Sequence, residues 1–305
     1  MSEQGLLHEL EPTVERLYAR HLDSTKEWFP HEQVPYGRGR DPDPERPWCA
    51  DDADLGGATI DDAVRSALIV NLLTEDNLPY YFRTIERMFG ADGIWGAWAR
   101  RWTAEEGRHS MAIYGYLMVT RAVDPVALER ARMSQVSGGL VPEPSSAADG
   151  FVYVALQELA TRIAHRNTGR LIGDEAGYGV MMRVAADENL HYLFYRDLAS
   201  AALAIDPSTM VKAIERQVIG FEMPGGGIPG FADHARAIAR SGVYDLAIHH
   251  DQILVPVVVR HWDVEHLTGL DDEAEQARDR LMARLAKSGR VARRVADRKA
   301  ELVSA

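Results

Sequence analysis

Two short segments of the sequence pair a glutamate with a histidine at a spacing that suits metal binding. RWTAEEGRHS (101–110) contains Glu106 and His109, and AADENLHYLF (185–194) contains Glu188 and His191. Residues three positions apart lie on one face of a helix, so each segment predicts a carboxylate and an imidazole that point the same way. Together, these groups suit a non-haem iron ion.

Each segment follows a predicted helix that carries one more glutamate in an apolar setting. Glu75 comes after ALIVNLLT, 31 residues before Glu106, and Glu158 comes after FVYVALQ, 30 residues before Glu188. One glutamate from each of two helices and an ExxH from each of two others is the ligand pattern of di-iron and di-manganese sites in four-helix bundles. The sequence therefore predicts six metal ligands: Glu75, Glu106, His109, Glu158, Glu188 and His191.

Neighbouring acids offer alternatives to this set. Glu105 lies four residues from His109, a spacing that favours Glu106, whereas Asp76 stays open as an alternative to Glu75. A single ExxH is common on solvated helix faces, so a metal-free helical scaffold is the alternative to the whole site. Four buried carboxylates without cations would cost several kcal/mol each, and two divalent cations would balance their charge.

The remaining sequence predicts an all-α fold that forms one domain over 1–305. We expect an N-terminal helix and loop in 1–58, the metal-binding four-helix bundle in 59–204, and further helices with a charged tail in 205–305. Proline and glycine predict loops at 28–57, 137–150 and 223–230. Residues 60–89 are expected to be helical throughout after an N-cap at Thr59 or Asp61. Asp124-Pro125 and Asp206-Pro207 are further expected helix starts, and 244–262 is also expected to be helical.

Bulk composition excludes several protein classes. An apolar fraction of 46% and a charged fraction of 26% indicate a soluble globular protein, and a net charge of −12 disfavours a nucleic-acid binder. Cys49 is the single cysteine, so no disulfide framework is expected. We find neither a signal-peptide pattern nor an apolar run of about 18 residues, which predicts a cytoplasmic protein without a membrane span.

Four segments together resemble the soluble acyl-[acyl-carrier-protein] desaturases of actinobacteria. They are TEDNLPYY (74–81), RWTAEEGRHS (101–110), LQELATRIAHRNTG (156–169) and AADENLHYLFYRD (185–197), within a resemblance that extends over about 8–262. It implies a homodimer with a ferritin-like four-helix bundle core, additional helices and two iron ions (Fe2+/Fe3+). It also implies O2, a ferredoxin-type electron donor, and a cis double bond placed in an acyl chain on acyl carrier protein. An acidic carrier would require a basic patch, which the sequence does not locate.

The resemblance also implies roles for individual residues. Thr161 matches a catalytic threonine beside the oxygen-binding side of the irons, and Trp28 and Asp187 match an electron relay towards His109. Each has a simpler interpretation: a helix threonine that bonds back to a carbonyl, a packing tryptophan, and an acid that only orients a ligating histidine. His165 and Asn167 resemble structural polar groups, and Tyr80 and Tyr81 are interpreted as packing residues.

The sequence departs from the family pattern at Gly107 and Ser110, where EEGRHS replaces the usual EENRHG. Glycine inside a helix costs roughly 1 kcal/mol, so local helix rigidity is in question although no ligand is lost. Rival functions on the same fold are another di-iron oxygenase, such as a hydroxylase or N-oxygenase, and an iron-storage shell. The ligand pattern does not separate the first rival from a desaturase.

Overall fold

The computed structural model describes residues 2–43 and 45–304, with side chains up to residue 298, and every regular element within these ranges is a helix. The helices are α1 (Glu3–Ser24), α2 (Pro30–Gln33), α3 (Asp62–Glu75), α4 (Leu78–Phe89), α5 (Gly93–Thr120), α6 (Pro125–Gly138), α7 (Ala147–Leu171), α8 (Glu175–Ile205), α9 (Pro207–Ile219), α10 (Phe231–Ser241), α11 (Leu246–His249), the π-helix η3 (His250–His261) and α12 (Asp272–Ser304). Short 3-10 turns lie at Tyr36–Arg38, Ala50–Asp52 and Val264–His266.

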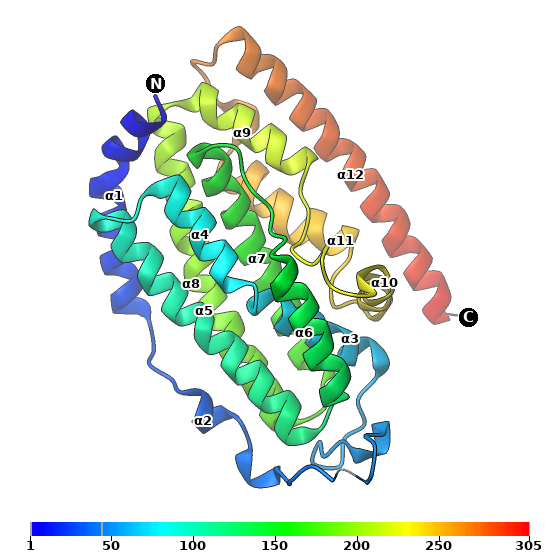
Figure 1. Cartoon of the computed structure of the whole chain (residues 1–305). Coiled ribbons are helices and arrows are strands. Elements are labelled where there is room, and N and C mark those ends of the chain that lie inside the picture. The colour runs from blue at the N-terminus through cyan, green and yellow to red at the C-terminus, as the bar shows by residue number, and fades with distance from the viewer. Residues whose placement is uncertain (1, 44, 305) are drawn as a thin grey trace.

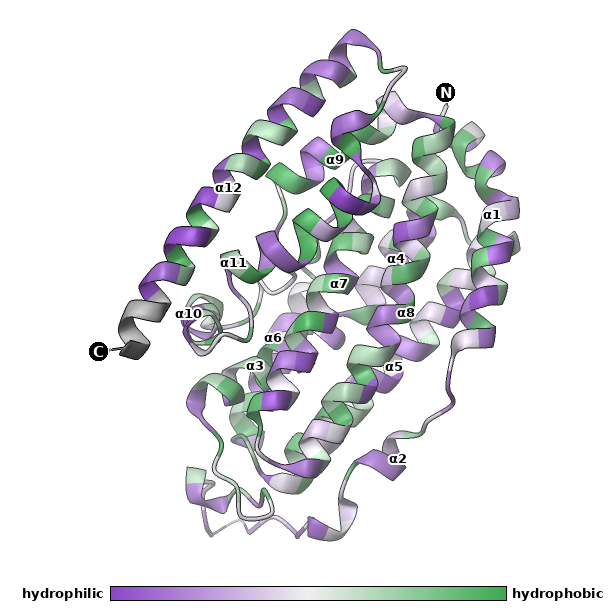
Figure 2. Cartoon of the chain, turned by 180° about the vertical axis from the view of Figure 1, so that it is seen from behind, coloured by the Kyte–Doolittle hydropathy of each residue, from purple (hydrophilic) through white to green (hydrophobic). Residues whose placement is uncertain are grey.

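Four helices form the central bundle, in which α3 packs on α5, α5 on α8, α8 on α7, and α7 back on α3. Helices α1 and α4 cover two sides of it, and α9, α11 and α12 lie together on another side (Figure 1). The outer face of α12 is mostly hydrophilic, whereas apolar residues follow the side that contacts the protein (Figure 2). No helix in the described part of the chain combines the length and apolar composition needed to cross a bilayer.

Aspartate side chains cap the first turns of several helices. Asp61 accepts a hydrogen bond from the Ala63 amide, which selects one of the two N-cap candidates of the sequence. Asp124 and Asp206 cap α6 and α9 in front of Pro125 and Pro207, as predicted. A side-chain oxygen at this position satisfies an amide that has no partner inside the helix.

Two predicted elements are corrected by the structure. The expected continuous helix over 60–89 is wrong, because α3 ends at Glu75 and α4 begins at Leu78. Pro79 lacks an amide hydrogen and its ring would clash with the carbonyl of Glu75, four residues earlier. The predicted helix over 244–262 is π-wound in its second part, which contains Pro256. Hydrophobic spacing alone does not distinguish this winding from an α-helix.

The apolar core is divided along α5 and α8 by a polar layer. Trp98 and Phe194, whose ring centroids are 3.5 Å apart, belong to one buried cluster, and Leu72, Ile113 and Met181 belong to the other. Between them, α5 presents Glu105, Glu106 and His109, and α8 presents Asp187, Glu188 and His191, all buried. The two apolar clusters therefore seal a layer of ionisable side chains from both ends.

A second buried carboxylate, Asp149 near the start of α7, joins the α6–α7 loop to α9. It accepts hydrogen bonds from Ser145 and Ser146 on one side and from Arg216 and Gln217 on the other. Burial by itself would raise the pKa of Asp149, but these donors outweigh burial, and the pKa is lowered. The loop is thus tied to α9 through one charged group.

We expect Gly107→Ala to raise the free energy of unfolding by about 1 kcal/mol, because an added methyl group would meet only a Leu78 methyl at 3.9 Å. Gly169→Ala is the matched substitution, in which the added atom would lie 2.9 Å from the Met181 Cβ at the α7–α8 contact. It should lower the free energy by about 1–3 kcal/mol. Urea unfolding monitored by circular dichroism measures both values, and equal effects of the two substitutions would contradict this packing.

We expect Asp149→Asn to destabilise the protein by about 1–3 kcal/mol at neutral pH, because Arg216 loses its charged partner. A carboxyl group with a lowered folded-state pKa contributes stability above its unfolded pKa of about 3.9. That contribution is lost as the pH falls through the folded-state pKa. In urea titrations, the free energy of unfolding of the variant should therefore decline less steeply below about pH 4 than that of the wild type. An equally steep decline in both proteins would contradict the assignment.

Candidate metal centre

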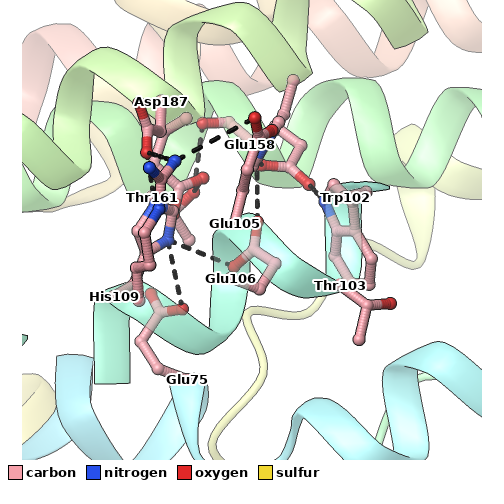
Figure 3. A network of polar contacts seen from close by, with 12 residues as sticks. Glu75, Trp102, Thr103, Glu105, Glu106, His109, Glu158, Thr161 and Asp187 are labelled. Atoms are coloured by element: carbon pink, nitrogen blue, oxygen red, sulfur yellow. Dashed lines mark hydrogen bonds and ion pairs between the residues drawn. The ribbon is translucent and has the colours of Figure 1, made fainter. Parts of the chain in front are cut away.

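The six predicted ligands converge in the middle of the bundle. Glu75 comes from the end of α3, Glu158 from α7, and the two ExxH pairs from α5 and α8. Figure 3 shows Glu75, Glu106, Glu158 and His109 directed towards a common centre. Their side chains could form two groups of metal ligands: one contains Glu75, Glu106, His109 and Glu188, and the other Glu106, Glu158, Glu188 and His191.

The two histidines each direct Nδ1 into the centre. His109 Nδ1 lies 3.3 Å from Glu106 Oε2, 3.4 Å from Glu188 Oε1 and 3.7 Å from Glu75 Oε2. His191 Nδ1 lies 2.8 Å from Glu106 Oε1 and 3.5 Å from Glu158 Oε2. Because Glu106 and Glu188 belong to both ligand groups, either carboxylate could bridge two cations.

Several atoms that face the centre make no well-aligned hydrogen bond within the described part of the chain, although some of them lie within ion-pair distance of one another. They include one oxygen each of Glu106 and Glu158 and the Nδ1 atoms of both histidines. These residues are at most 7% exposed, so water does not replace the missing partners freely. Buried polar atoms of this kind are costly unless paired, and two divalent cations would pair with all of them. The residues therefore fit a metal pair.

The pKa shifts of the glutamates also indicate that the centre is suited to cations. Burial raises the pKa of Glu158 well above its ordinary value, and the neighbouring charge of Glu188 adds to this. The pKa of Glu106 is raised for the same two reasons. In Glu75, the neighbouring imidazoles of His109 and His165 outweigh burial, and the pKa is lowered. Without cations, the four carboxyl groups cannot all be ionised together, because like charges at this distance repel.

On the side away from the centre, the Nε2 atom of each histidine lies beside a further carboxylate. His191 Nε2 lies 3.0 Å from Glu105 Oε2, and His109 Nε2 lies 3.4 Å from Asp187 Oδ2. Such contacts commonly fix the orientation of ligating histidines. Glu105, the alternative to Glu106, belongs to neither of these two groups: it lies on the outer side of His191, where it could form a third group with His21 and His191. Hydrogen bonds with His21 and Arg101 hold it there. Asp76, the alternative to Glu75, lies in neither group.

The predicted electron-relay residues are in contact with one another. Trp28 Nε1 donates to Asp187 Oδ2 at 2.9 Å, and Arg108 donates to the same oxygen at 2.9 Å. Asp187 then faces His109, so a continuous path leads from Trp28 to the centre. The geometry accommodates both the relay and the simpler orienting role of Asp187.

Thr161 also makes both kinds of contact that the sequence allowed. Its hydroxyl lies 3.0 Å from the Glu158 carbonyl, as in an ordinary helix threonine, and 2.7 Å from Glu188 Oε2. Trp102 Nε1 donates to Glu158 Oε1 at 3.0 Å, which leaves the other oxygen of Glu158 directed to the centre. Thr161 therefore lies beside a carboxylate that both candidate metal positions share.

Two further histidines belong to the site: His165, interpreted from sequence only as a structural polar group, and His21, which no prediction included. His165 Nε2 lies 3.0 Å from Glu75 Oε1 and 3.6 Å from Glu188 Oε1, so it contacts two predicted ligands. Its position seven residues, or two helical turns, after Glu158 was the available signal. His21 Nε2 lies 2.9 Å from Glu105 Oε2. It belongs to α1, far from the motifs in sequence, and no local pattern marks it.

A narrow, mainly apolar cavity borders the centre and contains about 590 Å³ of empty space, open solvent at its mouth included. Its wall includes Glu75, Glu106, Glu188 and Thr161 on the side of the centre. The apolar part is formed by α4, α7 and two proline-containing loops, through residues such as Ile85, Met88, Pro144, Tyr153, Val154 and Pro224. Tyr81, interpreted from sequence as a packing residue, also lines it. Three predicted ligands are therefore reachable from one apolar space.

Comparisons with known proteins agree with this arrangement. The family model of the fatty acid desaturases matches residues 2–304. A Mycobacterium tuberculosis protein named "Putative acyl-[acyl-carrier-protein] desaturase DesA1" is 41% identical over 92% of this chain and 84% of its own length. The rice chloroplastic acyl-[acyl-carrier-protein] desaturase 7 is 31% identical over 97% of this chain and 78% of its own length.

A solved structure gives the same answer for the fold. The X-ray structure described as putative acyl-ACP desaturase DesA2 from Mycobacterium tuberculosis superposes with a TM-score of 0.69 at 27% sequence identity. The superposition covers 90% of this chain and 99% of that one. It confirms the predicted all-α, ferritin-like fold with a four-helix bundle core and additional helices. By family match, sequence identity and fold, the chain belongs to the acyl-[acyl-carrier-protein] desaturases of the fatty acid desaturase family.

Proposed function

We propose that this protein is a di-iron desaturase that introduces a cis double bond into a saturated acyl chain carried on acyl carrier protein. The observation that carries the proposal is the apolar cavity whose wall contains three of the carboxylates of the candidate metal centre. The relatives are named as acyl-[acyl-carrier-protein] desaturases, which supports an acyl chain on acyl carrier protein as the substrate. We also propose that the protein is a cytoplasmic homodimer and that it receives electrons from a ferredoxin-type donor.

Two iron ions would be held by Glu75, Glu106, Glu158, Glu188, His109 and His191. An iron pair would supply the oxidising chemistry of O2 with two external electrons. Overall, the acyl chain loses two hydrogen atoms from adjacent carbons, and O2 with two electrons and two protons from outside becomes two water molecules. The atoms and electrons of the reaction then balance.

The residues of this chain have three tasks in that reaction. The cavity wall binds the acyl chain and excludes water from it. The Thr161 hydroxyl, 2.7 Å from Glu188 Oε2, can hold or pass a proton at the edge of the cavity. Trp28 and Asp187 provide a contact path to His109, on the side of the centre that faces away from the cavity.

We expect about two iron ions per chain in protein loaded with ferrous iron. Glu106→Ala should bind fewer, because it removes a carboxylate common to both ligand groups. Glu105→Gln is the matched control one residue away: it should still load both ions, with an affinity that is about 10- to 100-fold lower. Iron analysis and circular dichroism measure content and folding. Equal iron content in Glu106→Ala and the wild type would contradict the ligand set, and no iron in folded wild-type protein would favour the metal-free scaffold.

We expect iron-loaded protein with ferredoxin, its reductase and O2 to give an unsaturated product from acyl carrier protein thioesters, identified by mass spectrometry. Val154→Phe should lower kcat/KM for the longest acyl chains by about tenfold or more, because the larger side chain fills part of the cavity. Val126→Phe, at an exposed position of α6, is the control and should leave the chain-length profile unchanged. A hydroxylated product would instead favour the oxygenase alternative.

A further inference from the structure

A hollow between α9, α10, α11 and α12 lies apart from the candidate metal centre. Its wall is mainly apolar and includes Val218, Met223, Leu254 and Val291. Two cations, Arg284 and Lys287 on α12, stand at its wall. Neither has a carboxylate within ion-pair distance among the residues that the structure describes, and both are exposed. One carboxylate, Asp245, also lines the hollow and accepts a hydrogen bond from the Ile248 amide. The hollow therefore combines an apolar interior with two cations and one acid, a net positive charge.

Phe221 lies between this hollow and the cavity beside the metal centre. Its ring centroid is 4.7 Å from that of His249 in the wall of the hollow, and 5.9 Å from that of Tyr153 in the wall of the cavity. Three residues later, Pro224 lines the cavity. The segment 221–224 is thus a wall with the metal-side cavity on one face and the hollow on the other.

The backbone around this wall favours local movement. Gly220 ends α9, and the following segment 223–230 has the sequence MPGGGIPG. Gly225 has φ of +153° and Gly230 has φ of +72°, conformations that glycine adopts at low cost. Phe221 is half-buried, and its side chain packs through ring contacts.

A different surface hollow also borders the cavity, because Met88 and Pro144 line both. Its charged residues are Glu3, Arg87 and Glu143, and Arg87 is already paired with Glu143 at 3.3 Å. That opening therefore offers no unpaired cation to a negatively charged partner. Of the two hollows next to the cavity, the one at α12 is electrostatically suited to an acidic carrier protein.

We propose that the hollow at α12 receives an acyl carrier protein thioester, with Arg284 and Lys287 contacting the acidic carrier and Phe221 yielding to let the acyl chain pass into the cavity. This inference rests on the proposed desaturase function and identifies the docking side of the substrate. The bound carrier keeps its negative charge at the surface, while the thioester arm crosses the apolar hollow. The basic patch that the sequence could not locate is therefore on α12.

The test measures binding of a fluorescently labelled saturated acyl carrier protein to the iron-loaded protein by anisotropy over a series of salt concentrations. Arg284→Glu with Lys287→Glu should weaken binding by about tenfold or more at low salt and reduce its salt dependence, because two attractive charges become repulsive. Arg16→Glu with Arg100→Glu, at exposed positions of α1 and α5 outside the hollow, is the matched double reversal and should bind nearly as the wild type does.

A second variant tests the partition. Phe221→Trp should leave iron content unchanged and lower kcat/KM for desaturation by about tenfold, because a bulkier ring hinders passage of the acyl chain. Wild-type binding by the double charge reversal, or unchanged turnover in Phe221→Trp, would overturn this inference while desaturation by the wild type upholds the proposed function. A wild type that neither binds the acyl carrier protein nor forms an unsaturated product would overturn both.

Discussion

The burial of four carboxylates and two imidazoles in one layer is the constraint on which the rest of the structure depends. Apolar clusters close this layer from both ends, and α1 and α4 cover the sides. Such a concentration of buried ionisable groups is unfavourable unless opposite charges neutralise it. The bundle is therefore a frame for a charge arrangement that a pair of divalent cations would complete.

Two carboxylates that lie beside the outer nitrogens of the histidines give this frame a near two-fold pattern. Glu105 precedes Glu106 and faces His191, whereas Asp187 precedes Glu188 and faces His109. Each of these acids also contacts an arginine and one side chain from residues 21–28, namely His21 for Glu105 and Trp28 for Asp187. The N-terminal segment thus closes both halves of the centre, although its sequence carries no metal-binding motif.

Much of the fold and of the candidate site could be predicted because the relevant signals are local. The ExxH spacing and the matched glutamates name six side chains that the fold brings together, and aspartates before prolines mark two helix starts. The end of α3 at Glu75 was missed, although Pro79 marked it. The π-winding of η3 and the contacts of His21 depend on tertiary packing, which no short sequence pattern records. The roles of Trp28, Asp187 and Thr161 remain predictions.

The break after Glu75 makes the four sides of the centre mechanically unequal. Glu106, Glu158 and Glu188 lie in the middle of helices of 28, 25 and 31 residues, whereas Glu75 is the last residue of α3. Backbone at a helix end is softer than in a helix interior, so the Glu75 carboxylate can shift without bending a long helix. The carbonyl end of α3 also carries partial negative charge, which adds to the attraction for a cation. The centre is therefore stiffer on three sides than on the fourth, where a bound metal ion would meet the most adjustable ligand.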